Sequence, residues 1–113
     1  MELERTEIDG ITIFELSGKI MGGPDAMMMN DQLHQVLESG HNKIIADLSS
    51  VEWMNSSGLG ILIQAATLLK NNQGRLKLAN VSERIQNLLK ITKLSGIFET
   101  SGSIEEAVTS LNN

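Results

Sequence analysis

The chain has 113 residues, a net charge of −5 and no cysteine, and these properties exclude several classes of protein. A chain of this length corresponds to one domain with its own core, so we expect a single domain over residues 1–113. The lack of cysteine excludes disulfides, cysteine-ligated zinc and thiol nucleophiles. With only two histidines, a histidine-rich metal site is not expected either, and we predict no metal and no cofactor.

The charge distribution also limits the partners. Nine lysines and arginines are outnumbered by 14 acids and form no basic cluster, which disfavours binding to nucleic acid. The N-terminal segment MELERTEIDG lacks the apolar core of a signal peptide. No apolar run approaches the roughly 18 residues that a membrane span needs. We therefore expect a cytoplasmic protein that does not insert into a membrane.

The first part of the chain predicts a hairpin followed by a helix. Apolar residues alternate or cluster at 3–8 and 11–17, on either side of a tight turn at Asp9-Gly10. A breaker-rich loop at 18–24 then leads into a helix that ends near Ser39-Gly40. The expected buried face of this helix is Met28, Leu33, Val36 and Leu37.

The rest of the chain alternates strands with helices. Residues 43–48 (KIIADL) predict a buried strand, and the helix at 57–71 is apolar nearly all round, which indicates an interior position. The remaining expected elements are a strand at 75–79, a helix at 82–91, a short strand around 97–100 and a helix from 103. The order β-β-α-β-α-β-α-β-α predicts an α/β fold, with a mixed sheet of about four to five strands packed against about four helices.

The turn Asn55-Ser56-Ser57-Gly58 lies where the strand region gives way to the 57–71 helix. Unpaired N–H groups and the positive end of the helix dipole favour an added negative charge there. A phosphate on Ser56 or Ser57 would therefore be stabilised, and it would change a surface that a partner reads. Serine is also a common N-cap residue, so an ordinary helix cap is the simpler explanation on chemistry alone.

The other polar candidates do not assemble an enzyme site. Catalysis by Ser56 would need a histidine base, and the sequence places neither His34 nor His41 within reach. Asp47 is either a ligand-binding acid at a strand end or a carboxylate that caps a loop. Gly58-Leu59-Gly60 has neither the spacing nor the lysine of a nucleotide-binding loop. We expect no enzymatic activity, and nucleotide binding is the weakest alternative.

Two apolar features are candidates for a partner surface. One helix face cannot bury all of Met27-Met28-Met29, so at least one of them faces outward, and Met21 lies close in the sequence. Trp53 is the only tryptophan. It either packs between sheet and helix or serves as an anchor for a partner.

The segment that runs from Asp47-Leu48-Ser49 through Val51-Glu52-Trp53-Met54 to Asn55-Ser56-Ser57-Gly58-Leu59-Gly60 resembles the STAS domain family of anti-sigma factor antagonists. The segment LSGKI at 16–20 and the element order are similar to that family as well. The resemblance implies a non-catalytic protein that binds an anti-sigma factor, which is also an ATP-dependent serine protein kinase. Binding would free a sigma factor for transcription, and phosphorylation of the antagonist would end this binding.

Carried over by motif position, the resemblance implies that Ser56 accepts the phosphate and that Asn55, Ser57 and Gly58 shape the turn. The partner-binding residues that it implies, together with the apolar features above, are Met21, Asp25, Met28, Trp53 and Leu59. Two features depart from the family pattern. Asn55 replaces the usual aspartate, and the loop at 21–25 is longer than usual.

Asn55 leaves one alternative open. A STAS protein that is not phosphorylated would act as an adaptor or scaffold subunit of a signalling assembly or of a membrane transporter. Incubation with a cognate kinase and ATP would separate this alternative from the phosphorylation switch. For either function, we expect a monomer or a weak dimer.

Overall fold

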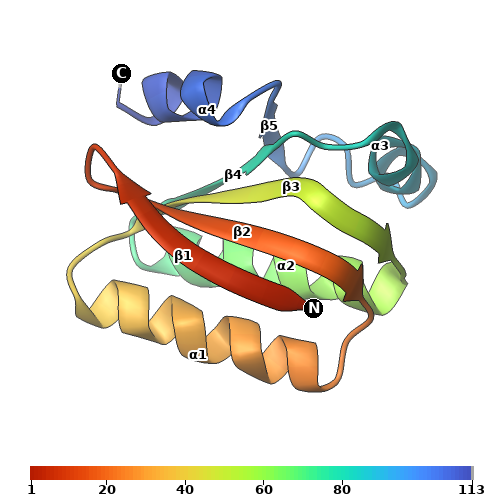
Figure 1. Cartoon of the computed structure of the whole chain (residues 1–113), viewed down its shortest axis with the longest axis horizontal. Helices are drawn as coiled ribbons and strands as arrows, with labels where there is room; N and C mark the ends of the chain where they lie inside the picture. The colour runs from red at the N-terminus through yellow and green to blue at the C-terminus, as the bar shows by residue number, and fades with distance from the viewer. Residues whose placement is uncertain (113) are drawn as a thin grey trace.

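Residues 1–112, which the computed structural model describes, form five strands and four helices in the predicted order (Figure 1). The elements are β1 (Glu2–Ile8), β2 (Ile11–Ile20), α1 (Pro24–Glu38), β3 (Lys43–Met54), α2 (Ser56–Asn71), β4 (Arg75–Ala79), α3 (Glu83–Ile91), β5 (Glu99–Ser101) and α4 (Ile104–Leu111). The strands form one sheet in the order β1-β2-β3-β4-β5. Only the β1–β2 pair is antiparallel. The predicted mixed α/β fold is confirmed.

Helices cover the sheet unequally on its two faces (Figure 1). Helices α1 and α2 lie side by side on one face, and α4 lies on the other. The larger core cluster lies between the sheet and α1 and α2, and it includes Phe14, Leu16, Ile44, Leu48, Leu62 and Leu69. A smaller cluster under α4 consists of Ile11, Ile13, Ile45, Ala79, Ala107, Val108 and Leu111. Strands β2 and β3 are therefore apolar on both faces near their start, as expected for the middle of a sheet.

Strands β2 and β3 are longer than their sequence patterns predict. The pattern ends them at residues 17 and 48, but they continue to Ile20 and Met54. The register between them shifts twice, between Glu15 and Ser17 and between Gly18 and Lys19. Gly18 has φ +81°, a conformation that costs glycine little, so the strand passes through an irregularity that would otherwise end it. The extension carries the end of β2 to the start of α2.

The phase of α1 differs from the expected one by one residue. The buried positions are Met29, Leu33 and Val36, which follow the i, i+4, i+7 spacing of a helix face. Met28 was predicted to face inward, and that prediction is wrong because the sequence of three methionines fits more than one phase. Met27 is the most exposed of the three.

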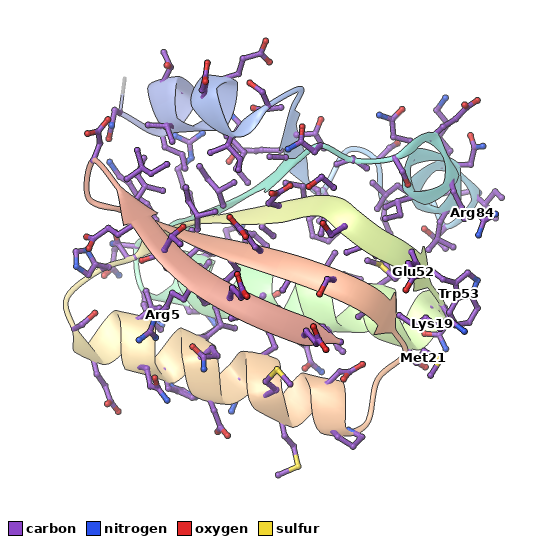
Figure 2. All side chains as sticks on the ribbon, in the orientation of Figure 1. Arg5, Lys19, Met21, Glu52, Trp53 and Arg84 are labelled. Atoms are coloured by element: carbon purple, nitrogen blue, oxygen red, sulfur yellow. The ribbon has the colours of Figure 1, made fainter. Side chains whose placement is uncertain are left out.

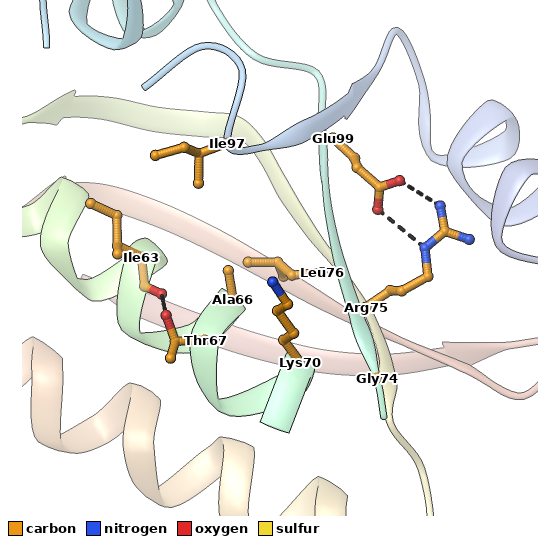
Figure 3. Close-up of a pocket in the computed structure, with 9 residues that line it drawn as sticks. All are labelled: Ile63, Ala66, Thr67, Lys70, Gly74, Arg75, Leu76, Ile97 and Glu99. Atoms are coloured by element: carbon orange, nitrogen blue, oxygen red, sulfur yellow. Dashed lines mark hydrogen bonds and ion pairs between the residues drawn. The ribbon is translucent and has the colours of Figure 1, made fainter. Parts of the chain in front are cut away.

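The short strand β5 begins at Glu99, later than the predicted residue 97, and it pairs with β4. Near this edge a pocket runs between the second half of α2 and β4 (Figure 3). At one end of it, Arg75 donates to Glu99 through Nε and Nη2, at 3.2 and 2.5 Å. These two hydrogen bonds connect the start of β4 to the start of β5.

The Arg75–Glu99 pair predicts a small stability change that depends on pH. The hydrogen bonds from Arg75 hold the pKa of Glu99 below its ordinary value. A lowered carboxyl pKa stabilises the fold above the unfolded-state pKa, and this contribution disappears as the pH falls through the folded-state pKa. Glu99→Gln should lower the free energy of unfolding at pH 7 by about 1 kcal/mol or less, because water screens a pair whose side chains are 42% and 46% exposed. Urea unfolding should show the difference from wild type narrowing toward acidic pH; a difference that stays constant would contradict the pairing.

Candidate functional site

The site is the junction between β3 and α2, and Asn55 is its N-cap residue. The Oδ1 atom of Asn55 accepts a hydrogen bond from the Gly58 N–H at 2.7 Å. Its carbonyl oxygen accepts the first intrahelical bond, from the Leu59 N–H at 2.9 Å. The cap is therefore supplied by asparagine, and neither serine is needed for it.

Ser56 and Ser57 are the first two residues of α2, and both are exposed. Within residues 1–112, neither hydroxyl makes a hydrogen bond, and the first turn of α2 contains no acidic residue. The backbone N–H groups at such a helix start have no intrahelical acceptor. A negative group on either serine would thus meet free donors and the positive end of the dipole without a competing carboxylate.

Gly58 allows β2 and α2 to approach each other closely. A Cβ atom at residue 58 would lie 2.1 Å from the carbonyl oxygen of Ile20, closer than any side chain permits. The same carbonyl accepts a hydrogen bond from the Asn55 N–H at 3.3 Å. The end of β2 therefore packs directly against the turn. Residue 58 has to be glycine, because no side chain fits there.

The loop between β2 and α1 lies against Ser57. A Cβ atom at Gly22 would be 3.1 Å from the Ser57 Cβ. Asp25 holds this loop, because its carboxylate accepts hydrogen bonds from the Met21 N–H and from the Met1 ammonium, both at 3.3 Å. Asp25 thus has a structural role in the loop, and the loop that it holds lies against Ser57.

The predicted partner-binding residues have different exposures. Met21, Met28 and Trp53 are 50%, 37% and 38% exposed, so all three can contact a partner. Trp53 does not fill the space between sheet and helix, which was one of the two expectations for it. Leu59 is 1% exposed and belongs to the core. Its predicted contact with a partner is wrong, because the interior face of α2 begins in the first turn of the helix.

A cluster of charged residues surrounds Trp53, and sequence reasoning missed it. Trp53 and Met21 line a surface pocket together with Lys19, Glu52 and Arg84 (Figure 2). Lys19 pairs with Trp53 in the β2–β3 register, while Arg84 comes from the first turn of α3. Because β4 runs parallel to β3, α3 starts at this end of the sheet, and no local sequence signal places Arg84 in the pocket.

The other polar candidates have structural roles. Asp47 is buried in β3, where its carboxylate accepts from the Ser49 N–H and from Asn80 Nδ2, each at 3.0 Å. Ser49 lies within β3, so Asp47 fixes the irregular part of that strand and connects it to Asn80 after β4, and the expected loop cap is not what the structure shows. His41 pairs with Glu7 at 3.3 Å and precedes β3, whereas Ser56 follows the far end of that strand, so the two cannot form a nucleophile–base pair.

Within residues 1–112, no group of three or more His, Cys, Asp or Glu side chains could hold a metal ion. In the same part of the chain, no helix combines the length and the apolar character that crossing a membrane requires.

Substitutions at Asn55 should separate its capping role from the charge of the usual aspartate. Asn55→Ala removes the acceptor for the Gly58 N–H and should lower the free energy of unfolding by about 1 kcal/mol. Asn55→Asp keeps the acceptor, adds a charge at the positive end of α2 and should be as stable as wild type or slightly more stable. Chemical denaturation monitored by circular dichroism would measure both. If Asn55→Ala kept full stability, another group would have to cap the helix.

Comparison with known proteins identifies the family. The STAS domain family model matches residues 2–107. The chain belongs to the STAS domain family. Curated relatives of this STAS domain include the anti-sigma-B factor antagonist of Bacillus subtilis, 35% identical over 83 residues that cover 74% of this chain and 75% of that protein. The anti-sigma-B factor antagonist of Listeria monocytogenes is 33% identical over 100 residues, covering 88% and 85% of the two chains.

Solved structures confirm the STAS fold. A Thermotoga maritima crystal structure superposes with a TM-score of 0.87 at 22% identity and covers 98% of this chain and 95% of its own. The anti-sigma factor antagonist SpoIIAA in its unphosphorylated form gives a TM-score of 0.72 at 16% identity, with 96% of each chain covered. The phosphorylated form of Bacillus SpoIIAA also gives 0.72, at 18% identity, and covers 96% of this chain and 98% of its own. At these identities the similarity establishes the fold alone.

Proposed function

We propose that this STAS domain is a cytoplasmic anti-sigma factor antagonist whose binding is switched off by phosphorylation of Ser56. Its partner would be an anti-sigma factor that is also an ATP-dependent serine kinase, and its output would be sigma-factor-dependent transcription. Named relatives of the chain are anti-sigma factor antagonists, which supports the class of function. One structural neighbour, SpoIIAA, has been solved in both phosphorylated and unphosphorylated forms.

The observation that carries this proposal is the free hydroxyl at a helix start that is already capped. Because the side chain of Asn55 accepts the Gly58 N–H, a phosphate on Ser56 would not destroy the cap. Ser56 is preferred over Ser57 because the Gly22 loop lies against Ser57. Modification at Ser56 therefore changes the surface charge and leaves the packing of α2 in place.

The phosphate would act through electrostatics. It adds about −1.5 to −2 charge three residues after Trp53, whose side chain is exposed like that of Met21. A partner that packs on these apolar groups in the unmodified state would have to desolvate a dianion after phosphorylation. Release of the partner follows without any refolding of the antagonist.

Intact-mass analysis tests the modification. The protein is incubated with ATP and a serine kinase that functions as an anti-sigma factor in the same organism. We expect one phosphate on wild type and on Ser57→Ala, and none on Ser56→Ala. A phosphate that persists on Ser56→Ala would place the acceptor elsewhere.

The alternative function, a STAS adaptor or scaffold that is not phosphorylated, predicts a different outcome in the same assay. Wild type would bind its partner and gain no phosphate. Asn55→Asp, which restores the charge of the usual family motif, should be phosphorylated at least as fast as wild type if the kinase reads that aspartate. If Asn55→Asp gained a phosphate and wild type did not, Asn55 would be the residue that prevents phosphorylation and leaves the protein permanently able to bind its partner.

A further inference from the structure

The pocket around Trp53 has features that the fold does not require. Trp53 is 38% exposed and Met21 is 50% exposed, although large apolar side chains are normally buried. The two residues are supplied by β3 and by the loop after β2, and they line one pocket (Figure 2). Tryptophan and arginine are the residues most enriched among those that dominate binding energy in interfaces, and Arg84 lines the same pocket.

The charge at this pocket is opposite to that of the whole protein. Lys19 and Arg84 face one carboxylate, Glu52, whereas the chain carries a net charge of −5. Within residues 1–112, neither cation has a carboxylate within 4.0 Å. Arg84 lies in the first turn of α3, where the helix dipole disfavours a positive charge, so its position does not stabilise that helix.

We propose that Lys19, Met21, Trp53 and Arg84 form a docking site for an acidic segment of the anti-sigma factor that also carries an apolar side chain. The apolar group packs on Trp53 and Met21, and the carboxylates pair with the two free cations. This inference rests on the proposed function and specifies the chemistry of its partner. The docking site lies close to Ser56, because three residues of extended chain place the Cα atoms of Trp53 and Ser56 at most about 11 Å apart.

Trp53 is the only tryptophan, so its fluorescence reports on this site directly. The probe is the purified serine kinase that functions as an anti-sigma factor in the same organism, with its own tryptophans replaced by phenylalanine. On addition of this kinase, acrylamide quenching of Trp53 should fall, because the bound segment covers the indole. The measurement uses the full chain in its unphosphorylated form.

Charge-reversal variants test the two cations. Lys19→Glu and Arg84→Glu should each weaken the affinity by about tenfold or more, and the wild-type affinity should fall with added salt. Lys90→Glu is the matched control, because it makes the same charge change at an exposed residue of α3 outside the pocket, and it should bind within about twofold of wild type. Trp53→Ala should weaken binding more than Trp53→Phe, with thermal unfolding confirming that each variant is folded.

The outcomes separate the two proposals. If the complex forms, Trp53 becomes protected and the pocket variants lose affinity, the docking site is supported. If the complex forms while Trp53 stays accessible and Lys19→Glu binds like Lys90→Glu, the docking site is overturned and the antagonist function remains. If the wild type binds no such kinase, the proposed function fails and the docking site fails with it.

Discussion

Gly58→Ala should be among the most destabilising single substitutions in this protein. The added Cβ would lie 2.1 Å from the Ile20 carbonyl oxygen and 2.7 Å from its carbonyl carbon, both of them backbone atoms that cannot rotate away. Relief requires β2 and α2 to separate, which breaks the packing around Ile20. Overpacking of this kind costs about 3 kcal/mol or more, a large share of the roughly 5–15 kcal/mol that stabilises a domain. Urea unfolding monitored by circular dichroism would measure the loss.

Gly60→Ala provides the matched control, because it makes the same chemical change two residues later in the same helix. A Cβ at residue 60 would have no neighbour within 4 Å, and alanine is the better helix former. The variant should therefore be more stable than wild type by up to about 1 kcal/mol. If the two variants unfolded at the same urea concentration, the close approach between Ile20 and α2 would not be a constraint in solution.

Phosphorylation of Ser56 should weaken binding to the anti-sigma factor by about 100-fold or more, which corresponds to about 2.7 kcal/mol. The loss comes from the desolvation of a dianion at the partner surface and from repulsion by partner acids. Isothermal titration calorimetry with the enzymatically phosphorylated and unmodified proteins would measure it.

Three variants make that experiment decisive. Ser56→Ala should bind like the unmodified protein, because the Asn55 cap does not use the Ser56 hydroxyl. Ser56→Glu should weaken binding less than phosphate does, since it adds a single charge. Ser57→Ala should retain the switch. Equal affinities for the phosphorylated and unmodified proteins would overturn the switch, even if Ser56 is the phosphorylated residue.

The residue pattern predicted a turn, helix or cap correctly where that element depends only on residues close in the sequence. The Asp9-Gly10 turn has φ values of +52° and +81°, as expected for a tight hairpin turn. Helix α2 forms where its apolar run predicts a helix, but it is not enclosed all round, because Gln64, Thr67 and Lys70 are exposed. Ser103 begins α4 at the predicted residue and caps it by accepting a hydrogen bond from the Glu106 N–H, because a serine three residues before a glutamate favours a helix start.

Predictions failed where a residue's environment depends on a neighbouring element. The bulged pairing of β2 with β3 carries both strands past Gly18 and Ser49, so strand ends judged from composition were too early. The rotation of each helix about its axis set the burial of Met28 and Leu59. Met29 takes the inward position in α1 instead of Met28, and Leu59 is already interior at the start of α2. A shift of one residue rotates a side chain by about 100°, which sequence periodicity over three identical residues cannot resolve.

The sequence by itself determined the order of the elements and the position of the Ser56 turn, because periodicity, glycines and capping residues act within a few residues of the chain. Only the tertiary structure decided that Ile20 excludes any side chain at Gly58 and which residues line the pocket with Trp53. Lys19 and Arg84 are 65 positions apart in the sequence. They line the same pocket because parallel crossovers bring the carboxyl ends of β2 and β3 and the start of α3 to the same end of the sheet.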